Sequence, residues 1–258
     1  MSGFRKFTEI EEREQRNKIY GVCVAIVTTI KQEDDDKQGH RVKLKFPWLP
    51  NSENEESDWA RVISMGAGKD RGFFCLPEKD DEVLVAFEHG HIARPYVIGN
   101  LWNGTDVSTY KNDSGADSGK NNIRAFKSRS GHILEFDDKK GEEKVTIKTQ
   151  KGALMVIDDK ALTITISDHA AENKTTIDNK NKKISIETTT GDILIKAKAT
   201  IRLECKTFEV KTDADATFDV GANFKVKASS NFEVKGSGTG MVQSSGALTV
   251  KGSQVNIN

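Results

Sequence analysis

The chain has 258 residues, 36% of them hydrophobic, with 39 basic and 39 acidic side chains. Globular domains usually reach roughly 45–50% apolar residues, Gly included, so a compact monomer with a thick core is not expected. Zero net charge provides no field that would attract nucleic acid or anionic lipid. No run approaches the roughly 18 apolar residues of a membrane helix, and Met1–Phe7 lacks an apolar signal segment, so we expect synthesis in the cytoplasm without a signal peptide.

The N-terminal half is predicted to consist of an arm, a barrel and a linker. In residues 1–18, Phe4, Phe7 and Ile10 have helical spacing, which fits either a short amphipathic helix or a solvated arm. Residues 19–103 alternate short strand-like runs with turns, as in a small closed barrel such as an OB-fold. The expected strands are Tyr20–Ile30, Arg41–Phe46, Trp59–Met65, Gly72–Leu76, Glu82–Phe87 and Pro95–Gly99. Residues 104–125 consist mainly of turn formers and are interpreted as a linker.

Two features of the barrel region resemble metal or redox sites but are interpreted as structural. Asp34–Asp36 is acidic but lacks the alternating spacing of an EF-hand loop, so we expect a solvated hairpin loop. Cys23, Cys75 and Cys205 are an odd number without metal-ligand spacing and are expected to be buried thiols of a protein made in a reducing compartment.

Residues 126–258 are periodic. Apolar–x–apolar triplets place two side chains on one face of a strand, and Gly, Ser, Ala, Asp and Lys between them suit tight corners. Six triplets repeat every eight residues: Phe208/Val210, Ala216/Phe218, Phe224/Val226, Phe232/Val234, Gly240/Val242 and Leu248/Val250. Eight looser triplets precede them: Leu134/Phe136, Val145/Ile147, Leu154/Val156, Ile164/Ile166, Thr175/Ile177, Ile184/Ile186, Ile193/Ile195 and Ile201/Leu203. Val255/Ile257 ends a series of 15 candidate strands, and such repetition is typical of a solenoid or fibre.

An octad, as we call one eight-residue repeat, cannot form a core alone. Its two apolar side chains return less free energy than the backbone entropy lost in ordering eight residues. Eight residues are too few to circle a core, but they can cover one side of a triangular prism shared by three chains. We therefore expect an all-β homotrimer in which the barrel precedes an intertwined β-helix, a needle-like β-prism.

Several motifs together closely resemble the VgrG proteins of type VI secretion and the central spikes of contractile phage baseplates and extracellular injection systems. They are Arg41–Trp48, Trp59–Val62, Gly72–Pro77, Asp81–Phe87 with Gly90, Arg94–Gly104 and Phe126–Asp138. Asp80-Asp81 departs from the Gly-Asp usual in this family. The resemblance covers about residues 19–258.

The resemblance implies a structural spike at the tip of a contractile tube, which would carry it to the target envelope on firing. Its implied partners are a separate hub or baseplate protein at the barrel end, a PAAR-repeat tip protein at the C-terminal end, the tube and possible effectors. The target membrane would be met only transiently, during puncture. Which contractile system is involved, and whether the chain is part of a longer protein, is left open.

The expected site is an assembly surface, with no catalytic, cofactor-binding or metal residues. The trimer core is expected to contain Phe208, Val210, Phe218, Phe224, Val226, Phe232, Val234, Val242, Leu248 and Val250. The tip partner is expected to bind Val255, Asn256, Ile257 and Asn258. His89 and His91 could suggest a metal site, but no other His pair follows, so we interpret them as loop residues.

Two other functions compete with this interpretation. A polysaccharide-degrading tailspike would also be a β-helix, but it needs paired carboxylates in a cleft. A nucleic-acid-binding OB protein would use Trp48, Trp59, Phe73, Phe74 and Trp102 for base stacking. Because no basic groove is evident, we assign these aromatic residues to core and inter-subunit packing.

Overall fold

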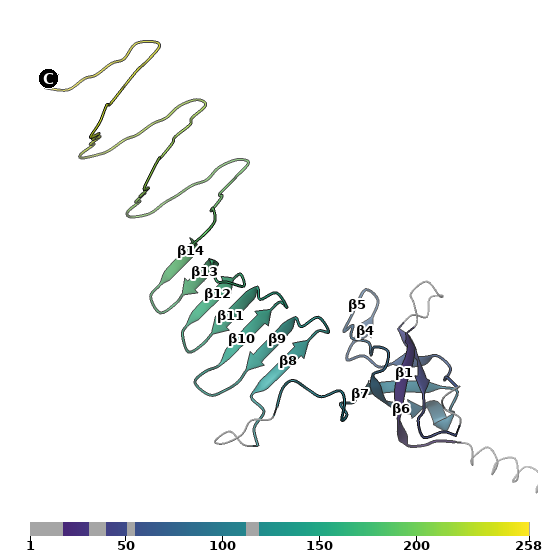
Figure 1. Ribbon diagram of the computed structural model, residues 1–258. Coiled ribbons are helices and arrows are strands. Elements are labelled where there is room, and N and C mark those ends of the chain that lie inside the picture. The colour runs from purple at the N-terminus through teal and green to yellow at the C-terminus, as the bar shows by residue number, and fades with distance from the viewer. Residues whose placement is uncertain (1–17, 31–39, 51–54, 112–118, 258) are drawn as a thin grey trace, which may run out of the picture. The chain divides into compact units, whose positions relative to one another are not determined.

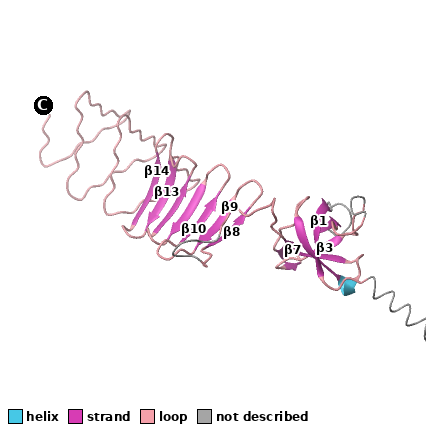
Figure 2. Ribbon diagram, turned by 60° about the horizontal axis from the view of Figure 1, so that its bottom comes forward, coloured by secondary structure: helices cyan, strands magenta, loops and turns pink. Residues whose placement is uncertain are grey.

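The computed structural model describes residues 18–30, 40–50, 55–111 and 119–257 (Figure 1). The expected arm, except Lys18, and the acidic loop Asp34–Asp36 lie outside these ranges. Apart from one short 3-10 turn, every regular element of the described chain is a strand, which confirms the all-β prediction (Figure 2). Within these ranges no helix has the length and apolar character needed to cross a membrane.

The first domain is a closed barrel of five strands, with the order β1-β2-β3-β7-β6. Its strands are β1 (Val22–Ile30), β2 (Arg41–Lys45), β3 (Ala60–Val62), β6 (Glu82–Phe87) and β7 (Pro95–Asn100). Strand β3 pairs parallel with β7, and all other neighbours are antiparallel. The 3-10 turn η1 (Glu88–Gly90) follows β6, and a two-stranded hairpin, β4 (Ala67–Gly68) with β5 (Arg71–Gly72), lies between β3 and β6. The predicted small barrel is confirmed.

The barrel core follows from the alternation within its strands. In β2 and β6 every second residue is buried, because successive strand side chains point to opposite sides. The buried apolar side chains are Ala25, Val27, Val42, Leu44, Phe46, Ala60, Val83, Val85, Phe87 and Val97. Aliphatic residues therefore fill the barrel, with Phe46 and Phe87 in ring contact at 5.6 Å.

A tight turn before β6 accounts for the Asp80-Asp81 pair. Asp80 has φ +74°, in the left-handed region, where Gly carries the least strain and Asp is better tolerated than most residues. Its backbone N–H donates to the Val27 carbonyl, and the Asp81 carboxylate accepts from the Glu78 N–H and the Asn100 amide. The departure from Gly-Asp therefore keeps the turn.

The predicted strand Gly72–Leu76 is wrong beyond Gly72. The Phe73 N–H donates to the Gly66 carbonyl, and the Phe73 carbonyl accepts from the Ser64 hydroxyl, so this backbone is held by a loop and not by a ladder. A Cβ on Gly72 would lie 2.5 Å from the Gly66 carbonyl oxygen, which explains glycine at this close approach. Trp59–Met65 is likewise shorter than expected, with only Ala60–Val62 in a strand.

The second part of the chain begins with a seven-stranded antiparallel sheet in which each strand pairs with the next (Figure 1). Its strands are β8 (Ile123–Lys127), β9 (Ile133–Asp137), β10 (Lys144–Lys148), β11 (Leu154–Asp158), β12 (Thr163–Ser167), β13 (Asn173–Asp178) and β14 (Lys183–Thr188). Successive triplets in this section therefore lie on one sheet of one chain and not on successive sides of a prism. The triplets of residues 134–186 are all in strands, whereas β8 had no predicted triplet.

Short turns with left-handed residues connect these strands. Gly131 and Gly152 have φ near +90°, and Leu162, Ala171 and Lys182 occupy the same region without being glycine. Aspartate carboxylates stabilise several of these turns: Asp158 accepts from the Ala161 N–H, Asp168 from Glu172 and Asn173, and Asp178 from Asn181. The tight turns force consecutive strands to be neighbours, which explains the single sheet.

Residues 194–257 form a separate unit with no strand pairing among its described residues. The backbone bends every eight residues, at 213–214, 221–222, 229–230, 237–238, 245–246 and 253–254, and is extended between these corners. The predicted octad corners are therefore confirmed. Both backbone edges of each extended segment are left without a neighbouring strand in the described chain.

Candidate functional site

One face of the seven-stranded sheet is a continuous apolar surface. The register places Phe136 opposite Val145, and Ile147 opposite both Leu134 and Met155. Directly opposed residues of an antiparallel ladder share a face, so the pairing extends this surface across all seven strands. We call it the sheet face; its apolar members are Phe126, Leu134, Phe136, Val145, Ile147, Met155, Ile157, Ile164, Ile166, Ile177, Ile184 and Ile186.

Much of the sheet face is exposed in the single chain. Ile166 is 53% exposed and Ile184 is 70% exposed, and Phe126, Phe136 and Ile186 are also accessible. Monomeric proteins rarely leave a contiguous apolar patch of this kind open, and such a patch usually marks an interaction surface. The sheet face is therefore the first candidate assembly surface.

The register corrects one predicted triplet. Met155 and Ile157, opposite Ile166 and Ile164, lie on the sheet face, so Leu154 and Val156 point to the other side. That other side carries mainly Thr, Ser and charged side chains, such as Thr165 opposite Val156.

The octad segments are the second candidate surface. The ten predicted core residues, Phe208, Val210, Phe218, Phe224, Val226, Phe232, Val234, Val242, Leu248 and Val250, are all exposed, with Val242 at 81%. Among them only Phe218 and Phe224 are in ring contact, with centroids 5.9 Å apart. The single chain thus does not bring these residues into a core. Val255, Asn256 and Ile257 are exposed as well, whereas Asn258 lies outside the described residues.

In the octad segments polar residues alternate with the apolar residues in the sequence and lie on the opposite side of the segment. The Lys235 Nζ lies 2.6 Å from Glu233 Oε1, and these residues stand on either side of Val234 in the sequence. Arg202 pairs with Glu204 in the same way around Leu203. Ion pairs between residues two apart fit extended strands with alternating faces.

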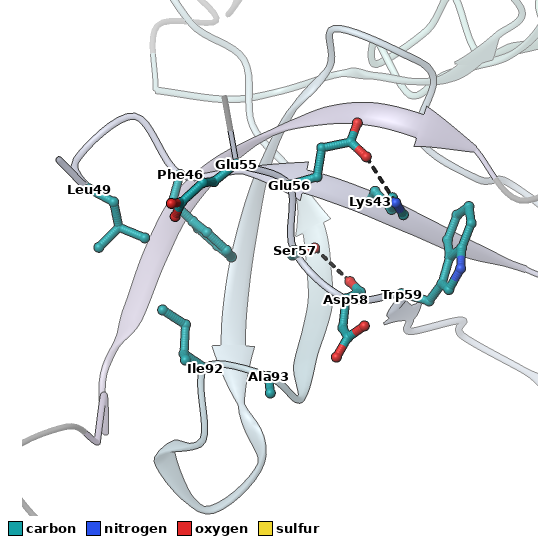
Figure 3. A pocket seen from close by; sticks show the side chains of 10 residues that line it. All are labelled: Lys43, Phe46, Leu49, Glu55, Glu56, Ser57, Asp58, Trp59, Ile92 and Ala93. Atoms are coloured by element: carbon teal, nitrogen blue, oxygen red, sulfur yellow. Dashed lines mark hydrogen bonds and ion pairs between the residues drawn. The ribbon is translucent and has the colours of Figure 1, made fainter. Parts of the chain in front are cut away.

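A groove on the barrel has an acidic rim (Figure 3). It has a volume of about 580 Å³, and Phe46, Leu49 and Ile92 supply apolar lining. Glu55, Glu56 and Asp58 contribute three carboxylates against the single ammonium of Lys43, which lies 3.0 Å from Glu56 Oε2. The groove is acidic, so a nucleic-acid backbone would be repelled.

The five aromatic residues assigned to core and inter-subunit packing lie outside the barrel core, contrary to the first part of that prediction. Trp48, Phe73, Phe74 and Trp102 are exposed, the last at 77%, and Trp59 is half-buried. Aliphatic side chains already fill the narrow barrel interior, so these larger rings remain outside it.

The predictions for the cysteine and histidine residues can be compared with their positions in the structure. Cys75 and Cys205 are exposed in this chain, so the prediction of buried thiols is wrong for the single chain; Cys23 is half-buried, and burial raises the pKa of its thiol. His89 lies in η1 with φ +49°, and His91 follows it. In the described ranges, no three His, Cys, Asp or Glu side chains are grouped so that they could hold a metal ion.

Comparison with known proteins identifies the barrel. Residues 25–102 match the type VI secretion system/phage-baseplate injector OB domain. The chain is 28% identical over 237 residues to the type VI secretion system spike protein VgrG1a of Pseudomonas aeruginosa, covering 82% of this chain and 36% of that protein. It is 30% identical over 142 residues to the spike protein VgrG1b of the same organism, covering 52% of this chain and 19% of that protein. It is 27% identical over 144 residues to the actin cross-linking toxin VgrG1 of Vibrio cholerae, covering 54% of this chain and 13% of that protein.

These matches agree with the closed barrel and the long sheet that follows it. The protein is thus of the class built on the OB domain of contractile injectors. Residues 25–102 match the OB domain of this family, and most of the chain is similar to a VgrG spike protein. It spans about a third or less of the length of the relatives named above.

Proposed function

We propose that three copies of this chain assemble into a rigid, non-enzymatic spike that transmits the force of a contractile injection machine to its target envelope. The observation that carries the proposal is the amount of apolar surface left open: the sheet face on one side of β8–β14, and the octad residues after Leu194. Three sheet faces turned toward a common axis form a closed three-sided core. Each chain then supplies one side.

The octad segments require a different arrangement, because they lack neighbours on both edges. Backbone N–H and C=O groups that leave water must find partners, and an extended segment needs a strand on each side. In a three-sided prism, a chain that turns a corner every eight residues leaves room above and below each segment. Segments of the other two chains fill these gaps, so all edges inside the stack are paired.

This arrangement accounts for a mechanical role. Strands that alternate between chains resist local opening, because no chain can peel away without breaking ladders to both neighbours. The apolar triplets from three chains would fill the prism interior, and the polar residues between them would face water. Such a shaft suits the spike of a family whose relatives are named spike proteins.

The partners in this proposal are assigned by chemistry and resemblance. Exposed apolar residues of the barrel, such as Met65 and Phe74, would contact a hub or baseplate protein or a neighbouring barrel. A PAAR-repeat tip protein would bind Val255–Asn258, where Ile257 is 91% exposed. The tube and any effectors would meet the chain through the assembled particle, and the target membrane only during puncture.

The two competing functions find less support in the described residues. A tailspike hydrolase needs two carboxylates about 5–10 Å apart across a sugar-binding cleft, and the octad carboxylates such as Glu233 lie on an exposed strand beside lysines. A single-strand-binding OB protein needs a basic groove. The groove beside Lys43 is acidic, and the neighbouring groove offsets Arg41, Arg61 and Arg94 in part with Asp58 and Glu88.

Light scattering coupled to gel filtration tests the proposal. A spike should have about three times the chain mass of 28.5 kDa and should keep that mass on dilution. A folded monomer would rule out the shared core. Incubation with cell-wall and capsular polymers, followed by an assay for new reducing ends, tests the tailspike function: release of such ends would contradict a non-enzymatic spike.

A further inference from the structure

The eight-residue repeat determines which residues of different chains lie side by side in a trimer. From one corner to the next a chain advances by eight residues, rises by one strand and turns by one third of a circle. The three-fold axis relates neighbouring chains by the same rotation without the rise. Combining the two operations leaves a pure translation of one strand spacing, about 4.8 Å. Residue i of one chain therefore lies beside residue i+8 of its neighbour.

The outward-facing positions of the octads form two columns under this rule. The step is seven residues between the triplets Ile201/Leu203 and Phe208/Val210, and eight at each step from there to Leu248/Val250. The first column contains Arg202, Glu209, Thr217, Lys225, Glu233 and Met241. The second column contains Lys196, Glu204, Lys211, Asp219, Lys227 and Lys235.

Both columns contain neighbours of opposite charge. The first five members of the second column are basic, acidic, basic, acidic and basic, and the first column contains the opposite-charge neighbours Arg202/Glu209 and Lys225/Glu233, separated by the uncharged Thr217. In the second column the alternation stops at Lys227/Lys235, and Lys235 has Glu233 of its own segment within 2.6 Å. Opposite charges on directly adjacent strands stabilise a sheet, and like charges destabilise it.

We propose that inter-chain ion pairs between consecutive members of each column hold neighbouring copies of the chain one octad apart. The inference rests on the trimeric spike proposed above and adds its register, with a second copy of this chain as the partner. Three octads carry the same pair of apolar side chains, Phe and Val (Phe208/Val210, Phe224/Val226 and Phe232/Val234), so these interior layers do not discriminate between a shift of one octad and a shift of two. The outer charges do discriminate, because a shift of two octads places like charges side by side in the second column, Lys211 beside Lys227 and Glu204 beside Asp219.

The pair Lys225/Glu233 offers a clean test, because its column neighbours Thr217 and Met241 are uncharged. Exchanging the two charges also leaves the sum of the contacts within the chain unchanged. In the native chain the pair Lys225/Lys227 is repulsive and the pair Glu233/Lys235 is attractive. In the exchanged chain the pair at 225/227 is attractive and the pair at 233/235 is repulsive. A double-mutant cycle of Lys225→Glu, Glu233→Lys and the double variant therefore isolates the pair.

The measurement is the unfolding rate of the full-length trimer in denaturant, with the mass of each variant determined in parallel. We expect the double variant to return to the native rate and the cycle to show a coupling factor on the order of tenfold, since three symmetry-related pairs change at once. Because the pair is exposed, about 0.5 M salt should reduce the coupling.

The possible outcomes distinguish the one-octad register from the trimeric spike on which it rests. Native trimers with a coupling factor near one would overturn the one-octad register and leave the trimer intact. A coupling that does not respond to salt would also contradict an exposed ion pair. A native protein that is monomeric would overturn the proposed spike itself, and the register with it.

Discussion

Replacing Phe218 by Asp should abolish assembly, whereas the same change at its neighbour Thr217 should not. Phe218 is a predicted core residue of the octads and is 74% exposed in the single chain, so nearly all of its burial would come from other chains. Thr217 stands on the opposite side of the same strand, between Glu209 and Lys225 in its column, where an added charge meets one neighbour of each sign.

The magnitude follows from three-fold symmetry. Loss of three buried phenyl groups costs about 2–3 kcal/mol each, or roughly 6–9 kcal/mol per trimer. Three carboxylates brought close together in a dry interior add several kcal/mol each. The sum is comparable to the entire stability of a typical domain, about 5–15 kcal/mol. Thr217→Asp changes only a solvated position, with an expected cost of about 1 kcal/mol or less per chain.

The assay is mass determination by analytical ultracentrifugation, with circular dichroism as a check that the barrel remains folded. Phe218→Asp should sediment near the chain mass of 28.5 kDa, and Thr217→Asp near three times that value. A fully assembled Phe218→Asp trimer of native stability, or dissociation caused by Thr217→Asp alone, would show that the inward and outward positions have been assigned the wrong way round.

Two further changes test other parts of the structure. On the sheet, Ile166→Lys should weaken the trimer strongly and Thr165→Lys only slightly, because Ile166 lies on the sheet face and Thr165 on the polar side; chemical denaturation compares them, and equal effects would contradict a shared core. The turn carboxylates should make stability depend on acid: the backbone N–H and side-chain amide of Asn181 lower the pKa of Asp178, and the Asn173 side chain and nearby backbone N–H groups lower that of Asp168. Since the folded pKa values lie below the unfolded value of about 3.9, this stabilisation is complete above about pH 5 and is lost as pH falls through the folded values. Thermal unfolding followed as the pH falls below about 5 should show a smaller loss of stability for Asp178→Asn than for the native chain. An unchanged loss of stability would show that Asp178 does not contribute to the acid dependence.

The octads show how much a repeat can predict. A constant spacing of eight residues, with small and polar residues between the triplets, determined the positions of the bends, and the structure has bends at that interval. The alternation of apolar and polar residues likewise predicted which side of a segment would carry charge. The two further chains that the sequence predicts as partners of these segments are not visible in a single chain, and nothing in the described part of the chain pairs with them.

The seven-stranded sheet was predicted less completely, for identifiable reasons. Leu154, Met155, Val156 and Ile157 are all apolar, so β11 offers two possible faces, and only the turns that set its register decide between them. In β8, Ile123 and Phe126 fall on opposite faces, so no triplet was visible. The strands begin 9 to 11 residues apart, and the short turns between them favour one sheet in one chain. The spacing of the triplets alone did not indicate this consequence.

In the barrel too, the sequence predicted the regular strands better than the loop between them. Its strands Arg41–Phe46 and Glu82–Phe87 were predicted, and in them every second residue is buried, including Val42 and Leu44 of β2 and Val83 and Val85 of β6. Adjacent Phe73 and Phe74 look like part of a buried strand, yet loop hydrogen bonds to Gly66 and Ser64 hold them outside. Composition predicts that large aromatic rings will be buried somewhere, but the barrel interior is too narrow to hold them all.

The central claim is that the octad segments of three chains interleave around one axis, and electron cryo-microscopy of the purified protein tests it most directly. Two triplets before the octads, six octads and the final Val255/Ile257 make nine segments per chain. Three chains then place nine strands on each side of the prism, which at about 4.8 Å per strand gives a regular section roughly 40 Å long. The map should show strands of different chains alternating up each side, with Val226 and Val234 inside. Octads that pair only within their own chain, or a particle containing a single chain, would contradict the account.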